Sequence, residues 1–520
     1  MKILIWIVAI LLFIIIAVTV TAGSWVRGKI ETAFNDANQD LTLKIAKVHL
    51  SMIKSRIEIE GATISSRQDH GDDRKIAMEM ATLKIRGIDL VETIFNRSID
   101  IGEVIISGLN IQAKGLLFRK TKPLVVSPVN IRIGRLLFEK VNLVMGSASN
   151  AQSLSIHGGV LNIFNLLVVK QDTISLSLIK VFDFDVKQIV TISADSMYTI
   201  SACGMSYSAN PNTLGVKTFS IQPNYSKYKF TSRFEYQKDR FEGSFSDMYI
   251  HDFNTSDFFK SGSLISPYIE IGKMDLKVFR DKRKKIRHVR KPVLQEIIYN
   301  YPGTVRIDSI AIITGNVVYT EHGSEANEPG SISFDEIKAG IFNITNDTLT
   351  KADGASLVLK GNAFLMGKGK LTILLKAELF NSHNPFSLEG TLSGLEAKEL
   401  NPILEKSAFI YVTSGKIDRM NFKFSANNIK SSGKMTLLYH GLDIAVKNKL
   451  TDDTTAFRER FISFMVNRKL LDSNPLPNEQ VRKGTIYYVR DPEKFLFGYC
   501  FRSILSGIKS SLVKSTGFFD

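Results

Sequence analysis

The sequence predicts a mainly β protein. We expect an N-terminal transmembrane helix, then an elongated, curled, mostly antiparallel and repetitive β-sheet with a groove-like apolar face, and short capping helices at the C-terminus. Three observations lead to this fold class. An uncharged apolar run occupies residues 3–20, apolar and polar residues alternate from 41 to 448, and helical spacing of apolar residues returns after 450.

The opening run predicts a membrane anchor. Residues 3–20 are 18 consecutive residues without a charge, with Lys2 before them and Arg27 and Lys29 after them. About 20 apolar residues, rising ~1.5 Å each, cross the ~30 Å hydrocarbon core of a bilayer as a helix. A cleaved secretory signal is the alternative, although its apolar part usually spans only ~7–15 residues. The flanking charges favour neither orientation of the helix in the membrane. Two residues before the apolar run and a large body after it are most simply explained by a signal anchor with the body exported.

The long middle of the chain predicts strands. Segments such as Leu41–Ile45, Arg56–Glu60 and Ile174–Leu178 place apolar side chains on one face. Long amphipathic helices, which parallel crossovers usually need, are missing here, so we expect a mainly antiparallel sheet. Strands recurring every ~8–12 residues need frequent turns, which we assign to Gly, Asn and Asp residues. These turn residues are Gly61, Gly108, Asn210–Asn212, Asn346–Asp347, Gly361–Asn362, Gly390, Gly415 and Gly433.

One sequence pattern occurs four times. An Ile-x-Ile pair, or a close variant, meets Gly or Asp, and a second apolar strand follows. A Gly there permits a bulge or bend, so that the strand continues with its apolar face turned inward and the sheet curls. Four similar copies favour one repetitive sheet over three unrelated domains. The copies begin at Ile99, Asn130, Tyr268 and Val305.

The order of these elements resembles the start of AsmA-like envelope proteins. The anchor is followed by a short polar helix at 25–38, a strand pair reaching Ile59–Thr63, and a strand at 83–90 that leads into the first repeat. Near the other end, 386–404 and the Ser-Gly turn at 414–416 resemble the later sheet, short helix and turn of that family. The resemblance rests on order and covers roughly half of the chain.

Membership of this family, which includes AsmA and TamB, would imply a branch of the bridge-like lipid-transfer group. In that group a curved β-groove carries lipid between membranes. The resemblance therefore implies a single-pass protein of the inner (cytoplasmic) membrane, with its body in the periplasm, that supports outer-membrane assembly. Residues 150–265 match no pattern of the family.

Five regions follow from the pattern and the resemblance. We expect a transmembrane signal anchor at 1–23, an AsmA-like β-groove region at 24–270, a basic loop and short helix at 271–300, a second β-groove region at 301–450, and a helical and strand cap at 451–520.

The apolar face of the sheet is the candidate site. Such a face must pack on another layer, close on itself, or shelter something apolar that is not protein. The chain offers few helices for a second layer, so the face suits acyl chains with their headgroups in water. Two halves of the sheet packed as a sandwich with a dry core are the alternative, and periodicity does not distinguish the two. The candidate groove residues are Ile57, Ile59, Ile99, Ile101, Leu357, Leu359, Leu371, Ile373, Phe422 and Phe424.

A dense basic run lies between two repeats. Eight of the twelve residues at 280–291 are Lys or Arg, just before Pro292 and a helical stretch at 293–299. Exposed cations of this kind bind anionic headgroups, and a solvated loop without a partner is the alternative. The candidate contacts for anionic lipid are Arg280, Lys282, Arg283, Lys284, Lys285, Arg287, Arg290 and Lys291.

The last 70 residues return to helical spacing. Amphipathic helices are expected at 454–471 and 492–513, with a strand at 485–489 between them. These helices either plug one end of the sheet or lie on a second membrane or a protein partner.

Composition argues against an enzyme. Cys203 and Cys500 lie about 300 residues apart and cannot form a disulfide framework. The eight histidines show no metal-ligand spacing, and no nucleotide-binding loop or nucleophile elbow occurs in the right context. We therefore expect no catalytic residue, no metal and no cofactor. The net charge of +16 suits anionic lipid better than nucleic acid in an exported protein.

The expected partners are membrane lipids, either phospholipid or glycolipid, and an envelope protein at the C-terminal end. The function that this predicts is lipid binding or transfer by an anchored groove. A structural scaffold without transport, anchored in the inner membrane, is the alternative.

Overall fold

The structure is a computed structural model of the 520-residue chain. It describes residues 23–38, 40–51, 55–67, 75–89, 98–114, 130–147, 152–169, 181–348, 356–446 and 470–513. The expected anchor at 3–20, the expected strand at 174–178 and all but the end of the expected helix at 454–471 lie outside these residues. No helix within the described ranges is both long and apolar enough to cross a bilayer.

The prediction of a mainly β, mostly antiparallel fold is confirmed. The described residues form 19 strands of 7–18 residues. They divide into two compact units, with the boundary between Asn224 and Tyr225, inside the region expected at 24–270.

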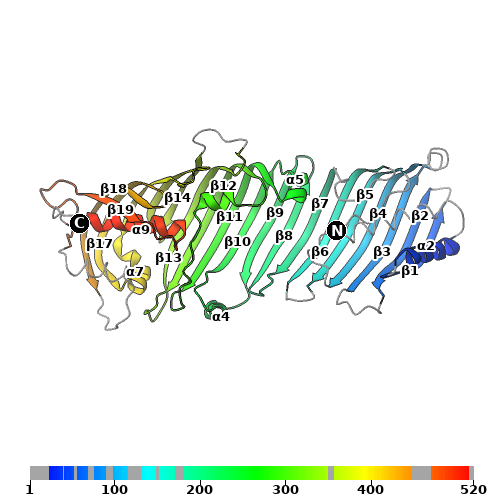
Figure 1. The fold of residues 1–520 in the computed structure, drawn as a ribbon, viewed down its shortest axis with the longest axis horizontal. Coiled ribbons are helices and arrows are strands. Elements are labelled where there is room, and N and C mark those ends of the chain that lie inside the picture. Colours follow the sequence, from blue (N-terminus) through cyan, green and yellow to red (C-terminus); the bar gives the residue numbers. More distant parts are fainter. Residues whose placement is uncertain are drawn as a thin grey trace. The chain divides into compact units, whose positions relative to one another are not determined.

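In the first unit each strand pairs with the next strand along the chain. The pair β4–β5 is parallel and the other neighbouring pairs are antiparallel. Helix α2 packs on β1. The elements are α2 (Gly23–Ala37), β1 (Leu41–Ser51), β2 (Arg56–Ser66), β3 (Lys75–Ile88), β4 (Ser98–Lys114), β5 (Asn130–Gly146), β6 (Ser153–Val168), β7 (Val181–Ile192), β8 (Tyr198–Ser208) and β9 (Thr213–Pro223) (Figure 1).

The second unit has the same sequential order. Here β11–β12 is the parallel pair. Helix α9 packs on β18 and β19, and α7 packs on β12, β13 and β17. The elements are α4 (Lys227–Ser232), β10 (Arg240–His251), α5 (Thr255–Ser261), β11 (Leu264–Asp281), α6 (Leu294–Tyr299), β12 (Val305–His322), β13 (Gly330–Thr345), β14 (Ser356–Leu365), β15 (Gly369–Glu378), β16 (Phe386–Glu396), η3 (Ala397–Leu400), α7 (Asn401–Ser407), β17 (Ile410–Ala426), β18 (Lys430–Val446), β19 (Lys483–Val489) and α9 (Leu496–Ser511) (Figure 1).

The four copies of the sequence pattern form the two parallel pairs. Ile99 of β4 lies opposite Ile131 of β5, and Ile269 of β11 lies opposite Ile310 of β12. Two copies of one sequence pattern place equivalent residues opposite one another along their whole length only when the two strands run parallel. The repeated pattern therefore matches the parallel pairing. The connection at 282–304 contains only the six-residue α6, which shows that a parallel crossover here needs no long helix.

The interpretation of most glycines as turns is wrong. Gly61 and Gly108 lie inside β2 and β4 with φ of 64° and 67°, a region that favours glycine. Alternation shifts by one residue at such a kink: Ile59 before Gly61 and Ala62 after it are both buried. The observed strands are therefore longer than the spacing of ~8–12 residues that the expected turns implied. Other glycines inside strands are Gly361, Gly390, Gly415 and Gly433, whereas Asn210–Asn212 and Asn346–Asp347 do lie outside strands.

A second row of kinks crosses β3, β4 and β5 at Gly87, Gly102 and Gly134. A Cβ atom on Gly134 would lie 2.8 Å from the carbonyl oxygen of Gly102, and one on Gly87 would lie 3.4 Å from the Gly102 Cα. The backbones approach too closely here for a side chain on Gly134. In β4, Ile101 before the kink and Val104 after it are both buried, so the kink keeps apolar residues on one face.

The free edge of β1 is covered by side chains of α2. The Leu43 N–H donates to Asn35 Oδ1 at 2.8 Å, and the Ile45 N–H donates to Glu31 Oε1 at 2.6 Å. Asn35 also donates from Nδ2 to the Leu43 carbonyl at 3.3 Å. These side chains take the place of a neighbouring strand, which protects the edge from pairing with another chain.

The free edge of β19 is covered in the same way by α9. The Thr485 N–H donates to Ser510 Oγ at 3.0 Å, and the Tyr487 N–H donates to Ser506 Oγ at 3.1 Å. Gly484 permits this approach, because a Cβ atom there would lie 2.2 Å from Ser511 Oγ. Both terminal strands among the described residues are thus closed by a helix.

We expect Gly134→Ala to destabilise the first unit by about 1–3 kcal/mol, since the new methyl group meets the Gly102 carbonyl. Gly146→Ala on the same strand is the matched control, because a Cβ atom there meets nothing within 4 Å. Urea unfolding followed by circular dichroism measures both. Equal midpoints for the two variants would contradict the role of the kink.

We expect Asn35→Ala to speed hydrogen exchange at the Leu43 amide, because that N–H loses its acceptor while α2 remains amphipathic. The loss of one hydrogen bond of about 1 kcal/mol corresponds to roughly fivefold faster exchange if opening stays local. Exchange mass spectrometry on peptides covering β1 measures it. Thr32→Ala, at an exposed position of α2, serves as the control and should leave the rate unchanged.

Candidate functional site

A continuous row of apolar side chains crosses the first unit. Each member lies directly opposite the next in the strand register, so all of them share one face of the sheet. We call this set the first apolar row. Its members, one from each strand from β1 to β9, are Val48, Ile59, Leu83, Ile106, Phe138, Leu161, Phe184, Tyr207 and Leu214.

A second apolar row crosses the second unit by the same register argument. A single glycine interrupts it at β18, where the backbone lies too close to Phe424 for a side chain. Its members, one from each strand from β10 to β19, are Ile250, Ile269, Ile310, Ile341, Leu359, Leu375, Leu388, Phe424, Gly433 and Ile486.

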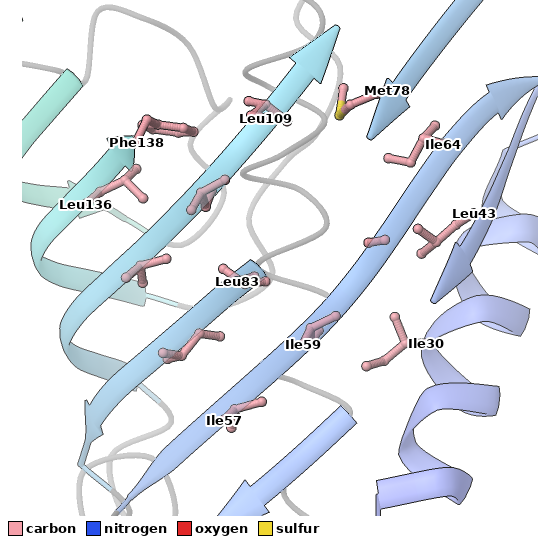
Figure 2. Close-up of a cluster of buried hydrophobic side chains, with 14 of the residues drawn as sticks. Ile30, Leu43, Ile57, Ile59, Ile64, Met78, Leu83, Leu109, Leu136 and Phe138 are labelled. Atoms are coloured by element: carbon pink, nitrogen blue, oxygen red, sulfur yellow. The ribbon is translucent and has the colours of Figure 1, made fainter. Parts of the chain in front are cut away.

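Burial of the first apolar row changes along the sheet. Ile59, Leu83 and Phe138 are at most 2% exposed, and Ile30 of α2 points toward the same cluster (Figure 2). Phe184 is half-exposed, and no residue of β7 is fully buried. The first unit therefore has a packed portion next to α2 and a more open portion at β7.

Burial of the second apolar row is lowest in its middle, between Ile269, which is 7% exposed, and the members near α9. Leu388 and Phe424 are at most 6% exposed, and Tyr499 of α9 lies edge-on to Phe386 with ring centroids 5.7 Å apart. Ile310, Ile341 and Leu359 are only partly buried and pack at the margins of the neighbouring buried clusters, and we call these three residues the open stretch.

The opposite face of the same strands is charged. Lys277 of β11, Lys338 of β13 and Lys360 of β14 are exposed there. Phe342 of β13 is also exposed on that face, with the Lys360 ammonium 5.8 Å from its ring centroid. The opposite face of the open stretch therefore carries lysines beside an aromatic ring.

The structure divides the ten candidate groove residues between the two units, always on the apolar face. Seven are fully buried and belong to the packed clusters, which makes them core residues in the described structure. The buried seven are Ile57, Ile59, Ile99, Ile101, Leu357, Phe422 and Phe424, and the three that remain half-exposed are Leu359, Leu371 and Ile373.

Sequence reasoning missed the more open positions. Phe184 lies between Asp183 and Asp185 just as the buried Ile59 lies between Glu58 and Glu60, so periodicity alone does not distinguish them. Ile310 and Ile341 lie in mainly apolar segments, where alternation is weak. Position relative to the packing helices separates the two groups, and that depends on tertiary structure.

The basic run is largely neutralised by carboxylates. Arg280 donates through Nε to Asp239 at 2.6 Å, and the Lys282 ammonium lies 2.6 Å from Glu321. Arg283 binds both oxygens of Asp281. Further pairs join Lys285 to Glu235 at 3.9 Å and Arg290 to Glu296.

The other members of the run are placed differently. Lys291 lies with its ammonium 5.3 Å from the centroid of the Phe495 ring. Arg287 is exposed and Lys284 is half-exposed. With five of the eight cations in ion pairs, the run as a whole is poorly suited to act as one headgroup site.

The same segment is docked on residues that precede α9. The Lys291 N–H donates to the Pro492 carbonyl at 2.8 Å, and Arg490 donates to the Lys291 carbonyl at 3.0 Å. His288 lies 2.9 Å from Glu493. The basic segment therefore fastens the β11–β12 connection to the C-terminal part of the second unit.

Across the residues that the structure describes, no three His, Cys, Asp or Glu side chains are grouped to hold a metal ion. Cys203 and Cys500 are both free thiols.

Comparison with protein-family models and with curated proteins finds no match to this sequence. The resemblance to AsmA-like proteins therefore stays a prediction, and the apolar rows carry the functional argument.

We expect Glu296→Gln to loosen the basic segment. The hydrogen bond from Arg290 lowers the pKa of Glu296, against the opposing effect of partial burial. A carboxyl whose pKa is lowered on folding stabilises above its ordinary pKa and loses that contribution as the pH falls through the lowered value. Trypsin cleavage after Arg287 should become about fivefold faster in the variant at neutral pH. Glu235→Gln, which removes a 3.9 Å pair between exposed side chains, should leave the rate unchanged.

Proposed function

We propose that this protein binds lipid along the apolar face of its sheet and moves it between membranes of the cell envelope. In this proposal residues 3–20 anchor the chain in the inner membrane, and the body works in the periplasm in support of outer-membrane assembly. No chemical step is required of the protein, because transfer of a lipid along an apolar surface breaks no bond.

The open stretch of the second apolar row carries the proposal. Exposed apolar area costs about 25 cal/mol per Å² relative to burial, so a folded protein seldom leaves a continuous apolar surface in water. Ile310, Ile341 and Leu359 lie side by side in register and are only partly buried. An acyl chain lying across the strands would cover them while its headgroup stays in water.

The continuity of the row also supports transfer rather than binding at one point. Successive strands lie about 4.8 Å apart, so neighbouring members of the row offer an acyl chain nearly equivalent contacts. Within the open stretch, a lipid would then move from one strand to the next without crossing a polar barrier.

A scaffold without transport is the second candidate. It is favoured by the packed cluster of β15–β19, where α9 fills the apolar face and leaves Phe424 only 1% exposed. In that case the anchored sheet would present its charged face to other envelope proteins.

Lipid content separates the two candidates. The full chain is purified, exchanged from detergent into an amphipathic polymer, and extracted for lipid mass spectrometry. Co-purified phospholipid or glycolipid in stoichiometric amount supports the carrier. A lipid-free, folded chain would falsify it and leave the scaffold.

We expect Ile341→Glu to slow lipid transfer between vesicles about tenfold, because a charge in the open stretch must be desolvated by each passing acyl chain. Phe342→Glu is the matched control, since Phe342 is the next residue and is 38% exposed on the other face. Fluorescent-lipid transfer and circular dichroism are measured for both. Equal transfer by two folded variants would count against the apolar face as the route.

A further inference from the structure

The polar face of the second unit has a hollow over β15, β16, β17 and β18. Its volume is about 480 Å³, which lies within the range of ~300–1,000 Å³ that is usual for small-ligand pockets. Helix α9 packs on the other face, where its Gly507 lies against Met435. Lys434 and Thr436 flank Met435 in β18 and therefore point away from α9, into the hollow. The hollow is thus separate from the second apolar row.

Two lysines lie directly opposite each other in this hollow. Lys423 of β17 faces Lys434 of β18 in the strand register, and both are exposed. Like charges in directly opposed positions destabilise a strand pair. The Lys423 ammonium lies 2.9 Å from Glu389 of β16, whereas no ion pair joins Lys434 to a carboxylate among the residues that the structure describes. One carboxylate therefore serves two opposed cations.

The first unit contains an opposed pair of cations with a different environment. Arg56 of β2 lies opposite Arg86 of β3. Arg56 lies 2.5 Å from Glu58, and Arg86 lies 3.5 Å from Glu103. Each arginine of that pair thus has a carboxylate partner. An anion beside Lys434 would complete the hollow in the same way.

A row of hydroxyl and amide groups lies next to the two lysines. Thr391 donates through Oγ1 to Asn421 Oδ1 at 2.9 Å, which leaves the amide N–H groups of Asn421 as donors. Within the described part of the chain, the hydroxyls of Thr372 and Thr436 make no hydrogen bond. A hydroxyl both donates and accepts, and the hydroxyls of a sugar do the same. This row therefore suits a ligand that is rich in hydroxyl groups.

We propose that the hollow binds an anionic carbohydrate, with its carboxylate or phosphate at Lys434 and its hydroxyl groups on Thr372 and Asn421. The unpaired cation and the adjoining hydroxyl row match the two chemical parts of such a ligand. The site lies on the face opposite to the one that we assign to acyl chains. The inference therefore does not depend on the proposed lipid transfer.

An acidic peptide fits the hollow less well. Peptides commonly bind a sheet by adding a strand at its edge. At β19 the N–H groups of Thr485 and Tyr487 already donate to serines of α9. Acidic side chains are recognised best by the bidentate fork of arginine, whereas the cations of the hollow are lysines.

A single-stranded nucleic acid fits less well too. Its bases stack on exposed aromatic rings. The aromatic residue that borders the hollow is Phe422, which is only 4% exposed and belongs to the apolar face.

The test compares one carbohydrate with and without its charge. Trigalacturonic acid and its uncharged methyl ester are titrated calorimetrically into the full chain in phosphatidylcholine nanodiscs. We expect Lys434→Gln to weaken binding of the acid about tenfold and to leave binding of the ester unchanged, because only the acid carries a charge. Thr372→Val should weaken both ligands about fivefold, since both lose the same hydrogen bond. Circular dichroism confirms that each variant is folded.

Two controls match the variants in residue type and exposure. Lys44 of β1 and Thr63 of β2 lie opposite each other and are exposed. Lys44 resembles Lys434 in that it forms no ion pair among the described residues. Neither Lys44→Gln nor Thr63→Val should change the affinity for either ligand.

Chemical labelling adds a readout of position. The unaltered chain is acetylated on its lysines with and without trigalacturonic acid, and the modified residues are identified by mass spectrometry. The ligand should slow acetylation of Lys434 and leave that of Lys44 unchanged. Equal protection of the two lysines would contradict a site in the hollow.

The outcomes separate this inference from the proposed function. The carbohydrate site is wrong if Lys434→Gln weakens both ligands equally or neither, if Lys44→Gln weakens the acid as much, or if the unaltered chain binds neither ligand. Triglutamate that binds as tightly as trigalacturonic acid and responds equally to Lys434→Gln would make the hollow a peptide surface, and would also overturn the inference. Each of these results leaves the proposed lipid transfer standing, because that uses the other face.

Discussion

The structure depends on one constraint: every strand must keep its apolar side chains on the same face of the sheet. Successive side chains of a strand point to opposite faces of the sheet. In a long strand whose sequence alternates imperfectly, the apolar residues therefore come to lie on the wrong face. Kinks at Gly61, Gly102 and Gly108 reset the phase, and Gly134 lets the neighbouring backbone pass. Without these positions the first apolar row would break, and the packed cluster of the first unit would break with it.

The same sheet also has to close its edges, and it does so with helices. α2 satisfies β1 through Glu31 and Asn35, and α9 satisfies β19 through Ser506 and Ser510. Each helix thus has two tasks, because it covers apolar residues and takes the place of a missing strand. Sealed edges confine further binding to the faces of the sheet, which is consistent with an apolar ligand on one face.

The sequence predicted those features that short-range pattern controls. The β class, α6, β19 and α9 follow from alternation, helical spacing or proline, α2 and α7 were expected as parts of the family resemblance, and the structure has each within a few residues. The prediction of turns at most glycines was wrong, because the sequence alone does not distinguish a glycine in a turn from one at a kink inside a strand. That distinction needs the pairing register of the strands. Ile59 and Phe184 both lie between two acidic residues but differ in exposure, since tertiary packing decides which apolar residues are covered. Asp281 and Glu296 lie within or just after the basic run, whereas Asp239 and Glu321 are distant in sequence, and their pairing with Arg280 and Lys282 depends on the fold.

The central claim is that lipid contacts the apolar face and no other. Benzoylphenylalanine placed at position 310, in the open stretch, or at position 311, on the opposite face, and irradiated in cells tests it most directly. The account predicts a lipid adduct at 310 and none at 311 by mass spectrometry of the purified full chain. Equal adducts at the two positions, or none at 310 in a folded chain, would contradict it.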